Sequence, residues 1–234
     1  MVAVSRKALG PADHARISAA IVTAESRTSG EIFCVLAHRV SSYREVSLGW
    51  AAAAALVLPM FLIPLNFDPA WFPGIADNWE AVHLAARHLT IGRALSAYAV
   101  LQAAVFVVVF LITSVPAIRD RITPLTMRRA RVRRAALQQF LAHGLHVTKR
   151  RTGVLIFASL AERQVEVIAD EGIHALVDDS VWADAVTLLT RAMRDGRPVD
   201  GFQSAVTLVG TVLAEHFPPG VGNPDELPNR LVEM

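Results

Sequence analysis

The chain has 234 residues, of which 53% are hydrophobic and 19% are charged, with one cysteine and a formal net charge of +2. Soluble domains average about 25% charged residues, and this apolar composition excludes disordered, collagen-like and disulfide-stapled classes. The apolar residues are concentrated, because no charged residue occurs within 46–67 or within 94–118. We therefore expect a membrane protein that also carries a folded polar part.

The first predicted elements are a helix and a strand. Residues 11–28 begin with Pro11, a good first residue of a helix, and place Ile17, Ile21 and Ala24 on one face. The run EIFCVLAH at 31–38 is continuously apolar, which is typical of a strand buried on both faces. Such a strand needs partner strands, and these must come from beyond the apolar runs.

The two apolar runs are each long enough to cross a bilayer, for which about 20 residues suffice. We predict a transmembrane hairpin over 46–118, with an outer loop at 68–93 that includes a short surface helix. A pair of buried core helices is the alternative. Residues 1–45 hold six lysines and arginines, residues 119–151 hold ten and the loop holds two. The positive-inside rule then places both termini in the cytoplasm.

The chain beyond the hairpin predicts the missing partners. Residues 124–143 favour a helix with Leu137, Phe140 and Leu141 facing inward, and 153–160 and 164–170 favour strands. Two helices then begin near Asp179 and Asp200, and 218–234 is expected to be an irregular tail. The predicted fold class is α/β, a small mixed sheet sandwiched by helices. Its two parts are residues 1–45 and 119–217.

Several sequence blocks resemble the TPM-domain family. They are TSGEI, TGVLIFASLAERQVEVIADEGI and the ending LLTRAMRDGRPVDGF…LAEHFPP…NPDELPNRLVE. The chain is most similar to a bacterial membrane branch in which a transmembrane hairpin splits the domain after its first strand. The resemblance implies a mixed sheet between helices and a bacterial inner-membrane location. It also implies a phosphatase activity or a calcium site at an acidic position.

An acidic segment is the first candidate for chemistry, and its carboxylates are Asp170, Glu171, Asp178 and Asp179. Ca²⁺ and Mg²⁺ prefer several oxygen ligands, and water held by such a metal can attack a phosphate. The segment resembles a family pattern of Gly-x-Gly-Leu followed by an aspartate, although Asp170 replaces the first glycine. In the alternative interpretation, Asp179 and Ser180 cap a helix and the other carboxylates are solvated.

An arginine block is the second candidate, formed by Arg128, Arg129, Arg131, Arg133 and Arg134. Residues 119–151 carry ten positive charges and one negative charge. Basic residues beside an anionic leaflet contribute roughly 1 kcal/mol each to membrane attraction. We therefore expect contact with anionic lipid. Nucleic acid is not an expected partner, because the block has no accompanying aromatic platform or nucleic-acid motif.

Two functions follow from these patterns. The first is a membrane-anchored, non-enzymatic interaction or assembly module, whose partner is another membrane protein or a second copy of the chain. The second is a metal-dependent phosphatase-like hydrolase that uses the acidic segment. Cys34 is interpreted as a structural thiol, because it lies in the middle of a predicted buried strand.

Overall fold

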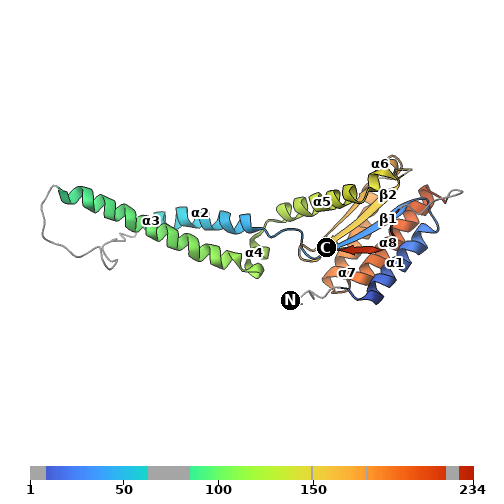
Figure 1. Ribbon diagram of the computed structural model, residues 1–234, viewed down its shortest axis with the longest axis horizontal. Helices are drawn as coiled ribbons and strands as arrows, with labels where there is room; N and C mark the ends of the chain where they lie inside the picture. Colours follow the sequence, from blue (N-terminus) through green and yellow to red (C-terminus); the bar gives the residue numbers. More distant parts are fainter. Residues whose placement is uncertain (1–8, 63–84, 149, 178, 220–226) are drawn as a thin grey trace. The chain divides into compact units, whose positions relative to one another are not determined.

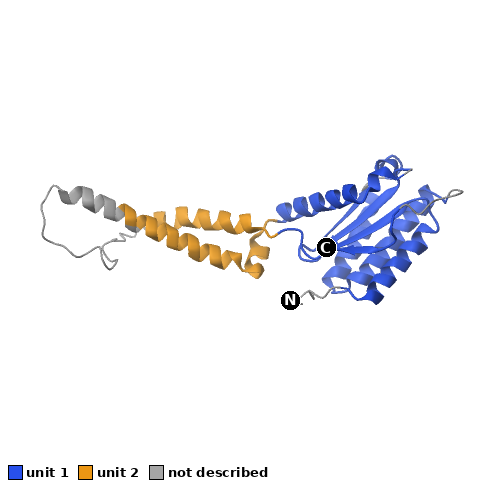
Figure 2. Cartoon of the chain, in the orientation of Figure 1, with its two compact units in different colours: residues 1–41, 125–234 blue, residues 42–124 orange. Residues whose placement is uncertain are grey.

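The structure is a computed structural model that describes residues 9–62, 85–148, 150–177, 179–219 and 227–234. Its chain forms two compact units (Figure 2). The α/β unit contains residues 1–41 and 125–234, and the hairpin unit contains residues 42–124. The chain thus enters the α/β unit, leaves it for the hairpin unit and returns.

The α/β unit is built around a four-stranded mixed sheet of order β3-β2-β1-β4. Its strands are β1 (Glu31–Ala37), β2 (Gly153–Ser159), β3 (Gln164–Ala169) and β4 (Leu231–Glu233). Strand β1 runs parallel to both β2 and β4, whereas β2 and β3 are antiparallel. The predicted mixed α/β architecture is confirmed, and the N-terminal strand β1 lies inside a sheet whose other strands follow the hairpin.

Helices cover both faces of this sheet (Figure 1). They are α1 (Pro11–Glu25), α5 (Leu125–Ala142), α6 (Glu171–His174), α7 (Ala183–Arg194) and α8 (Pro198–His216), with 3-10 turns η2 (Leu145–Val147) and η3 (Asp179–Trp182). One face packs against α1, α8 and α7, with α8 in contact with each of the other two. The opposite face packs against α5.

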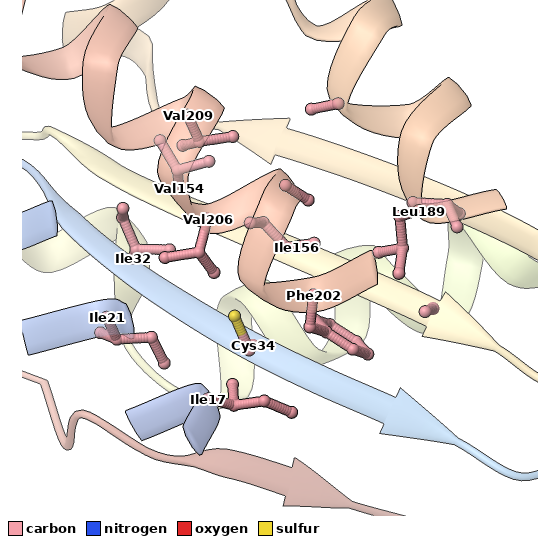
Figure 3. Packing of buried hydrophobic residues seen from close by; sticks show 14 of the residues in the cluster. Ile17, Ile21, Ile32, Cys34, Val154, Ile156, Leu189, Phe202, Val206 and Val209 are labelled. Atoms are coloured by element: carbon pink, nitrogen blue, oxygen red, sulfur yellow. The ribbon is translucent and has the colours of Figure 1, made fainter. Parts of the chain in front are cut away.

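The larger core lies between the sheet and the three-helix layer. Ile17 and Ile21 of α1 and Phe202 and Val206 of α8 are fully buried, and all four lie close to the strands in Figure 3. Helices α1 and α8 approach very closely at Gly210, where an added Cβ would lie 2.6 Å from the Cβ of Ala24. This glycine therefore sets the spacing of the two helices.

The C-terminal residues differ from the expected irregular tail. Residues 231–233 form β4, which pairs with β1 from Cys34↔Leu231 to Leu36↔Glu233. Backbone bonds from Met234 N to Leu36 O, at 3.0 Å, and from His38 N to Met234 O, at 2.8 Å, extend this pairing. The strand is short and follows a proline-rich stretch, so its sequence carries little periodicity.

Helix α5 also differs in the face that it buries. Val132, Ala136 and Phe140 are buried, whereas Leu137 is 42% exposed and Leu141 is 57% exposed. The buried positions repeat every four residues, and this places Leu137 and Leu141 beside the buried stripe. The expected inward orientation of the two leucines was therefore wrong, and α5 presents them to the surroundings.

The hairpin unit contains α2 (Arg44–Leu62), α3 (Ala85–Ser114) and α4 (Pro116–Ile122). Helices α2 and α3 pack against one another, and α4 contacts both. The predicted outer loop falls mostly on residues outside the described ranges. Its last residues, from Ala85 on, are instead the beginning of the continuous helix α3, so no separate surface helix exists there.

Candidate functional surfaces

The acidic segment begins with Asp170, directly after strand β3. Asp170 is 6% exposed, and its Oδ1 accepts a 2.7 Å hydrogen bond from Glu171 N, which caps α6. Its Oδ2 is buried and has no hydrogen-bond donor among the described residues. Gly172 allows this turn to pack, because an added Cβ would lie 2.6 Å from Arg151 O. The segment is thus a tight helix start with one unsatisfied carboxylate oxygen.

Of the three other carboxylates of the segment, only the side chain of Glu171 is described. Glu171 is exposed and forms an ion pair with Arg151, with 2.5 Å between Oε2 and Nη1. Asp178 lies outside the described residues, and of Asp179 only the backbone position at the start of η3 is described. Among the described residues, no group of three or more histidines, cysteines and acidic residues could hold a metal ion. The metal site stays a prediction.

The arginine block lies on α5, and the structure divides it. Its members are Arg128, Arg129, Arg131, Arg133 and Arg134. Arg131 Nη1 donates a 2.8 Å hydrogen bond to Ser41 Oγ, and Arg133 Nη1 lies 3.8 Å from Glu166 Oε2 on β3. Arg129 and Arg134 are exposed. Arg133 is also 70% exposed, so Arg129, Arg133 and Arg134 can each meet an anionic surface, whereas Arg131 is held by Ser41.

Glu166 is the acidic group that faces this basic helix. Burial raises the pKa of Glu166 above its usual 4.5, and the positive charges of Arg133 and Arg129 oppose that rise. The dominant cause is desolvation, because part of the carboxylate is shielded from water by the packing of α5 on β3.

Three groups that could carry nucleophilic or acid–base chemistry take part in structural contacts instead. Cys34 is fully buried, with its sulfur among Ile17, Phe202 and Val206 in Figure 3. Burial raises the pKa of the Cys34 thiol far above its ordinary value, which keeps it protonated and unreactive. Ser159 Oγ donates to Glu162 Oε2, and the same carboxylate accepts from Val40 N at 3.3 Å.

A groove between α1 and α8 was not predicted from the sequence. It has a volume of about 490 Å³ and a floor of alanines with Gly210, while Arg16 and Arg27 lie along its α1 side. Its α8 side is formed by Gln203, Thr207 and Thr211, which follow one another every four residues. This polar repeat on an otherwise apolar helix is the sequence signal that could have revealed it. None of the described lining residues is acidic, although Arg16 Nη2 forms a 2.8 Å ion pair with Asp200 Oδ1 on α8.

A second unpredicted feature is the anchor of the C-terminal strand. Glu233 Oε1 lies 2.8 Å from His14 Nε2 and accepts from Leu9 N at 3.1 Å, while Oε2 lies 3.3 Å from His38 Nε2. One carboxylate on β4 thereby joins α1, β1 and the chain before α1. These residues lie more than 190 positions apart in the sequence, so no local pattern could reveal the contact.

The hairpin unit presents an apolar exterior. Trp50, Leu56 and Phe61 on α2 and Val108 and Leu111 on α3 are each more than half exposed. By length and composition, Arg44–Phe61 is suited to cross a membrane, and a second span results if Tyr98–Ser114 and Pro116–Ile122 are counted together across a 93° bend. Water-soluble surfaces rarely expose contiguous apolar patches of this kind.

The described interior of the hairpin unit is made mainly of small and polar residues, although Tyr43 and Val46 are also buried at the start of the unit. Ala51 and Ala55 are buried between the helices, which permits close packing. Ser47 Oγ donates a 2.9 Å hydrogen bond to Thr113 O, and Thr113 Oγ1 donates to Ser47 O at 3.5 Å. These bonds join the first turn of α2 to the last turn of α3.

Comparison with known proteins agrees with the α/β fold. A family model described as the TPM domain matches residues 107–212. No curated protein matches the chain. A solved structure, the NMR structure of BA42 protein from the psychrophilic bacterium Bizionia argentinensis, has a TM-score of 0.53 and 17% sequence identity. The alignment covers 98% of this chain and 97% of that one.

The matched segment explains only part of the unit. It begins within α3 and ends within α8, so α1, β1 and β4 lie outside it although β1 is an inner strand of the sheet. At 17% identity, the likeness to BA42 concerns the fold alone. Residues 107–212 are therefore similar to the TPM domain, and the mixed sheet with its helices has a TPM-like fold.

Proposed function

We propose that this chain is a membrane-anchored interaction module, in which the hairpin unit crosses the bacterial inner membrane and the TPM-like α/β unit works on its cytoplasmic face. The observation that carries the proposal is the inverted packing of the hairpin unit, with alanines inside and large apolar side chains outside. Lipid removes the cost of exposing such side chains, and small residues let two helices approach without a hydrophobic driving force.

The charge distribution supports the orientation. Both segments that flank the hairpin unit are rich in lysine and arginine, and the predicted outer loop holds only Arg87 and Arg93. The exposed Arg129 and Arg134 follow the hairpin unit closely in sequence, and basic residues near the end of a span favour the leaflet with anionic headgroups. This assignment uses the lysine and arginine bias, which sets topology in membrane proteins more strongly than net charge does.

A binding role fits the α/β unit better than a catalytic role, because its candidate reactive groups are used in structural contacts. Cys34 is held protonated in the core, and Glu162 is occupied by Ser159 and a backbone amide. The groove between α1 and α8, which Arg27 lines and in which Arg16 pairs with Asp200, is the surface we assign to a protein partner in the same membrane.

Site-specific photocrosslinking tests this role. A photoreactive residue at Thr211, in the groove, is expected to give one discrete crosslinked product in intact cells. The same residue at Leu188, exposed on α7, is the control and is expected to give none. Equal crosslinking from both positions, or none from either, would count against a partner in the groove.

A metal-dependent phosphatase-like hydrolase is the second candidate function. It is favoured by one observation, the buried Asp170 Oδ2 that has no donor among the described residues, together with the phosphatase label of the matching family model. The described side chains alone do not supply a complete ligand set. Hydrolysis of an aryl phosphate that requires Ca²⁺ or Mg²⁺, and that is lost in both Asp170→Asn and Asp179→Ala, would replace the first proposal.

A further inference from the structure

The hairpin unit ends in a sharp elbow between α3 and α4. The axis of Pro116–Ile122 is turned by 93° from that of Tyr98–Ser114. Pro116 is the first residue of α4, and Val115 before it has φ −60° and ψ 124°, the extended conformation that a following proline favours. The elbow is therefore specified locally by the sequence Val-Pro and needs no contact with the α/β unit.

The charge-free part of α3 already has the length of a membrane span before this elbow. Residues 94–114 would extend over about 32 Å as a helix, compared with about 30 Å of hydrocarbon. The polar bonds between Ser47 and Thr113 lie at the end of this length. Helix α4 follows immediately and is turned by 93° from the direction of the span. The turn therefore falls where the hydrocarbon would end and the headgroups begin.

The two sides of α4 differ as expected for a helix at the boundary between hydrocarbon and headgroups. Ile118, at 37% exposure, and the neighbouring Arg121 face outward, and Val115 at the elbow is 47% exposed. Arg119 lies on the other side, where its side chain is 13% exposed and its Nε is 3.9 Å from Asp120 Oδ1. An outward isoleucine beside an outward arginine is suited to a boundary where apolar stems enter lipid and charged ends reach phosphate.

We infer that α4 is an interfacial helix, which lies in the plane of an anionic leaflet with Val115 and Ile118 in the acyl boundary and Arg121 at the lipid phosphates. The inference rests on the proposed membrane insertion of the hairpin unit. Two observations identify lipid as the occupant of this face: α4 continues directly from the proposed span, and residues 119–151 carry ten positive charges against one negative charge. The helix fixes the depth at which the chain leaves the membrane.

Depth measurements on spin-labelled variants test the inference with the full chain. Single nitroxides are attached at Ile118→Cys on α4, Val108→Cys on α3 and Thr187→Cys on α7, in nanodiscs of phosphatidylethanolamine and phosphatidylglycerol. Cys34 has no exposed surface, so the parent protein is expected to remain unlabelled. The measured quantity is the ratio of nitroxide collisions with oxygen, which concentrates in lipid, to collisions with a water-soluble nickel chelate.

The ratio is expected to be highest at 108, several-fold lower at 118 and lowest at 187. An aqueous value at 108 would overturn the membrane hairpin and this inference together. Suppose that the collision ratio at 108 is that of a label in lipid. A ratio at 118 that is typical of water, or one that is as high as the ratio at 108, would then overturn the interfacial helix alone. Ala117→Cys, on the same exposed side, repeats the measurement if the first variant fails to fold.

Lipid composition tests the role of Arg121. In nanodiscs of phosphatidylcholine alone, the label at 118 is expected to become shallower, because the attraction between Arg121 and anionic headgroups is lost. The label at 108 is the internal control and is expected to keep its value. An unchanged depth at 118 in the two lipid mixtures would remove the attraction of Arg121 to anionic headgroups from the assignment.

Discussion

In the α/β unit most large apolar side chains are buried, whereas in the hairpin unit most of the described large side chains on α2 and α3 lie outside and the residues buried between these helices are mainly small. Phe33 and Phe202 have no exposed surface, while Leu56 and Phe61 are more than 60% exposed. Both regions are helical and apolar in large part, so the difference lies in the solvent to which each surface is suited. The position of the large residues therefore separates a core made for water from a surface made for lipid.

The largest effect is expected from Phe202→Ala in the core of the α/β unit. Removing a fully buried phenylalanine costs about 3–5 kcal/mol of unfolding free energy, because the ring leaves a cavity among α1, α8 and the sheet. Hydrogen exchange of the β1 and β2 amides measures this loss in the full chain. Leu188→Ala, on the exposed side of α7, is the control and is expected to change exchange little. Similar losses from the two variants would contradict the assigned core.

The next largest effect is expected from Leu56→Asp in α2. A carboxylate at this exposed position is expected to oppose membrane insertion by about 2.5–3.5 kcal/mol, because an aspartate in hydrocarbon loses its hydration. The fraction of chains inserted, measured by glycosylation mapping in microsomes, reports the change. Leu56→Ala is expected to insert almost as the parent does. If the aspartate variant inserted equally well, position 56 would not face lipid.

A matched pair of glycine-to-alanine substitutions is expected to have a moderate effect at one position and almost none at the other. Gly210→Ala is expected to cost about 1–3 kcal/mol of unfolding free energy, because the new methyl group would lie 2.6 Å from Ala24 Cβ and force α1 and α8 apart. Gly49→Ala introduces the same methyl group into open space on α2 and is expected to be neutral or slightly stabilising. Exchange rates in α1 and α2 distinguish the two. A cost at Gly49 that equals the cost at Gly210 would show that the outer side of α2 is also packed.

The smallest effect is expected from Glu166→Gln, and it depends on pH. The pKa of Glu166 is raised above 4.5 in the folded protein, so the folded state holds its proton more tightly than the unfolded state does. The stabilisation from this group is complete below pH 4.5 and is lost as the pH rises through the higher folded pKa. Relative to the parent, the variant should therefore gain Tm as the pH rises above 4.5 and through the raised folded pKa of Glu166. A Tm difference that does not vary with pH would contradict a raised pKa of Glu166.

Much of the α/β fold could be predicted because its elements carry strong local signals. Continuous apolar runs predicted β1 and β2, and the positions Ile17, Ile21 and Ala24 correctly predicted the buried side of α1. Strand β4 escaped prediction, because three residues are too few to show a period and the strand is held by distant partners of Glu233.

The candidate surfaces were harder to predict because they depend on which side of an element packs. Leu137 and Leu141 were expected inside together with Phe140, but the packed side of α5 follows Val132, Ala136 and Phe140, which repeat every four residues. The arginine block could be recognised from sequence, whereas its division could not, because the contact of Arg131 with Ser41 joins residues 90 positions apart.

Alkaline carbonate extraction of native membranes tests the central claim most directly. The treatment releases proteins that are held at the membrane surface by charge or by partners, whereas proteins that cross the hydrocarbon remain in the pellet. The full chain is predicted to stay with the membrane pellet, because its exposed α2 and α3 side chains lie in lipid. Complete release into the carbonate supernatant would contradict membrane anchoring and would identify the apolar hairpin surface as one that another protein covers.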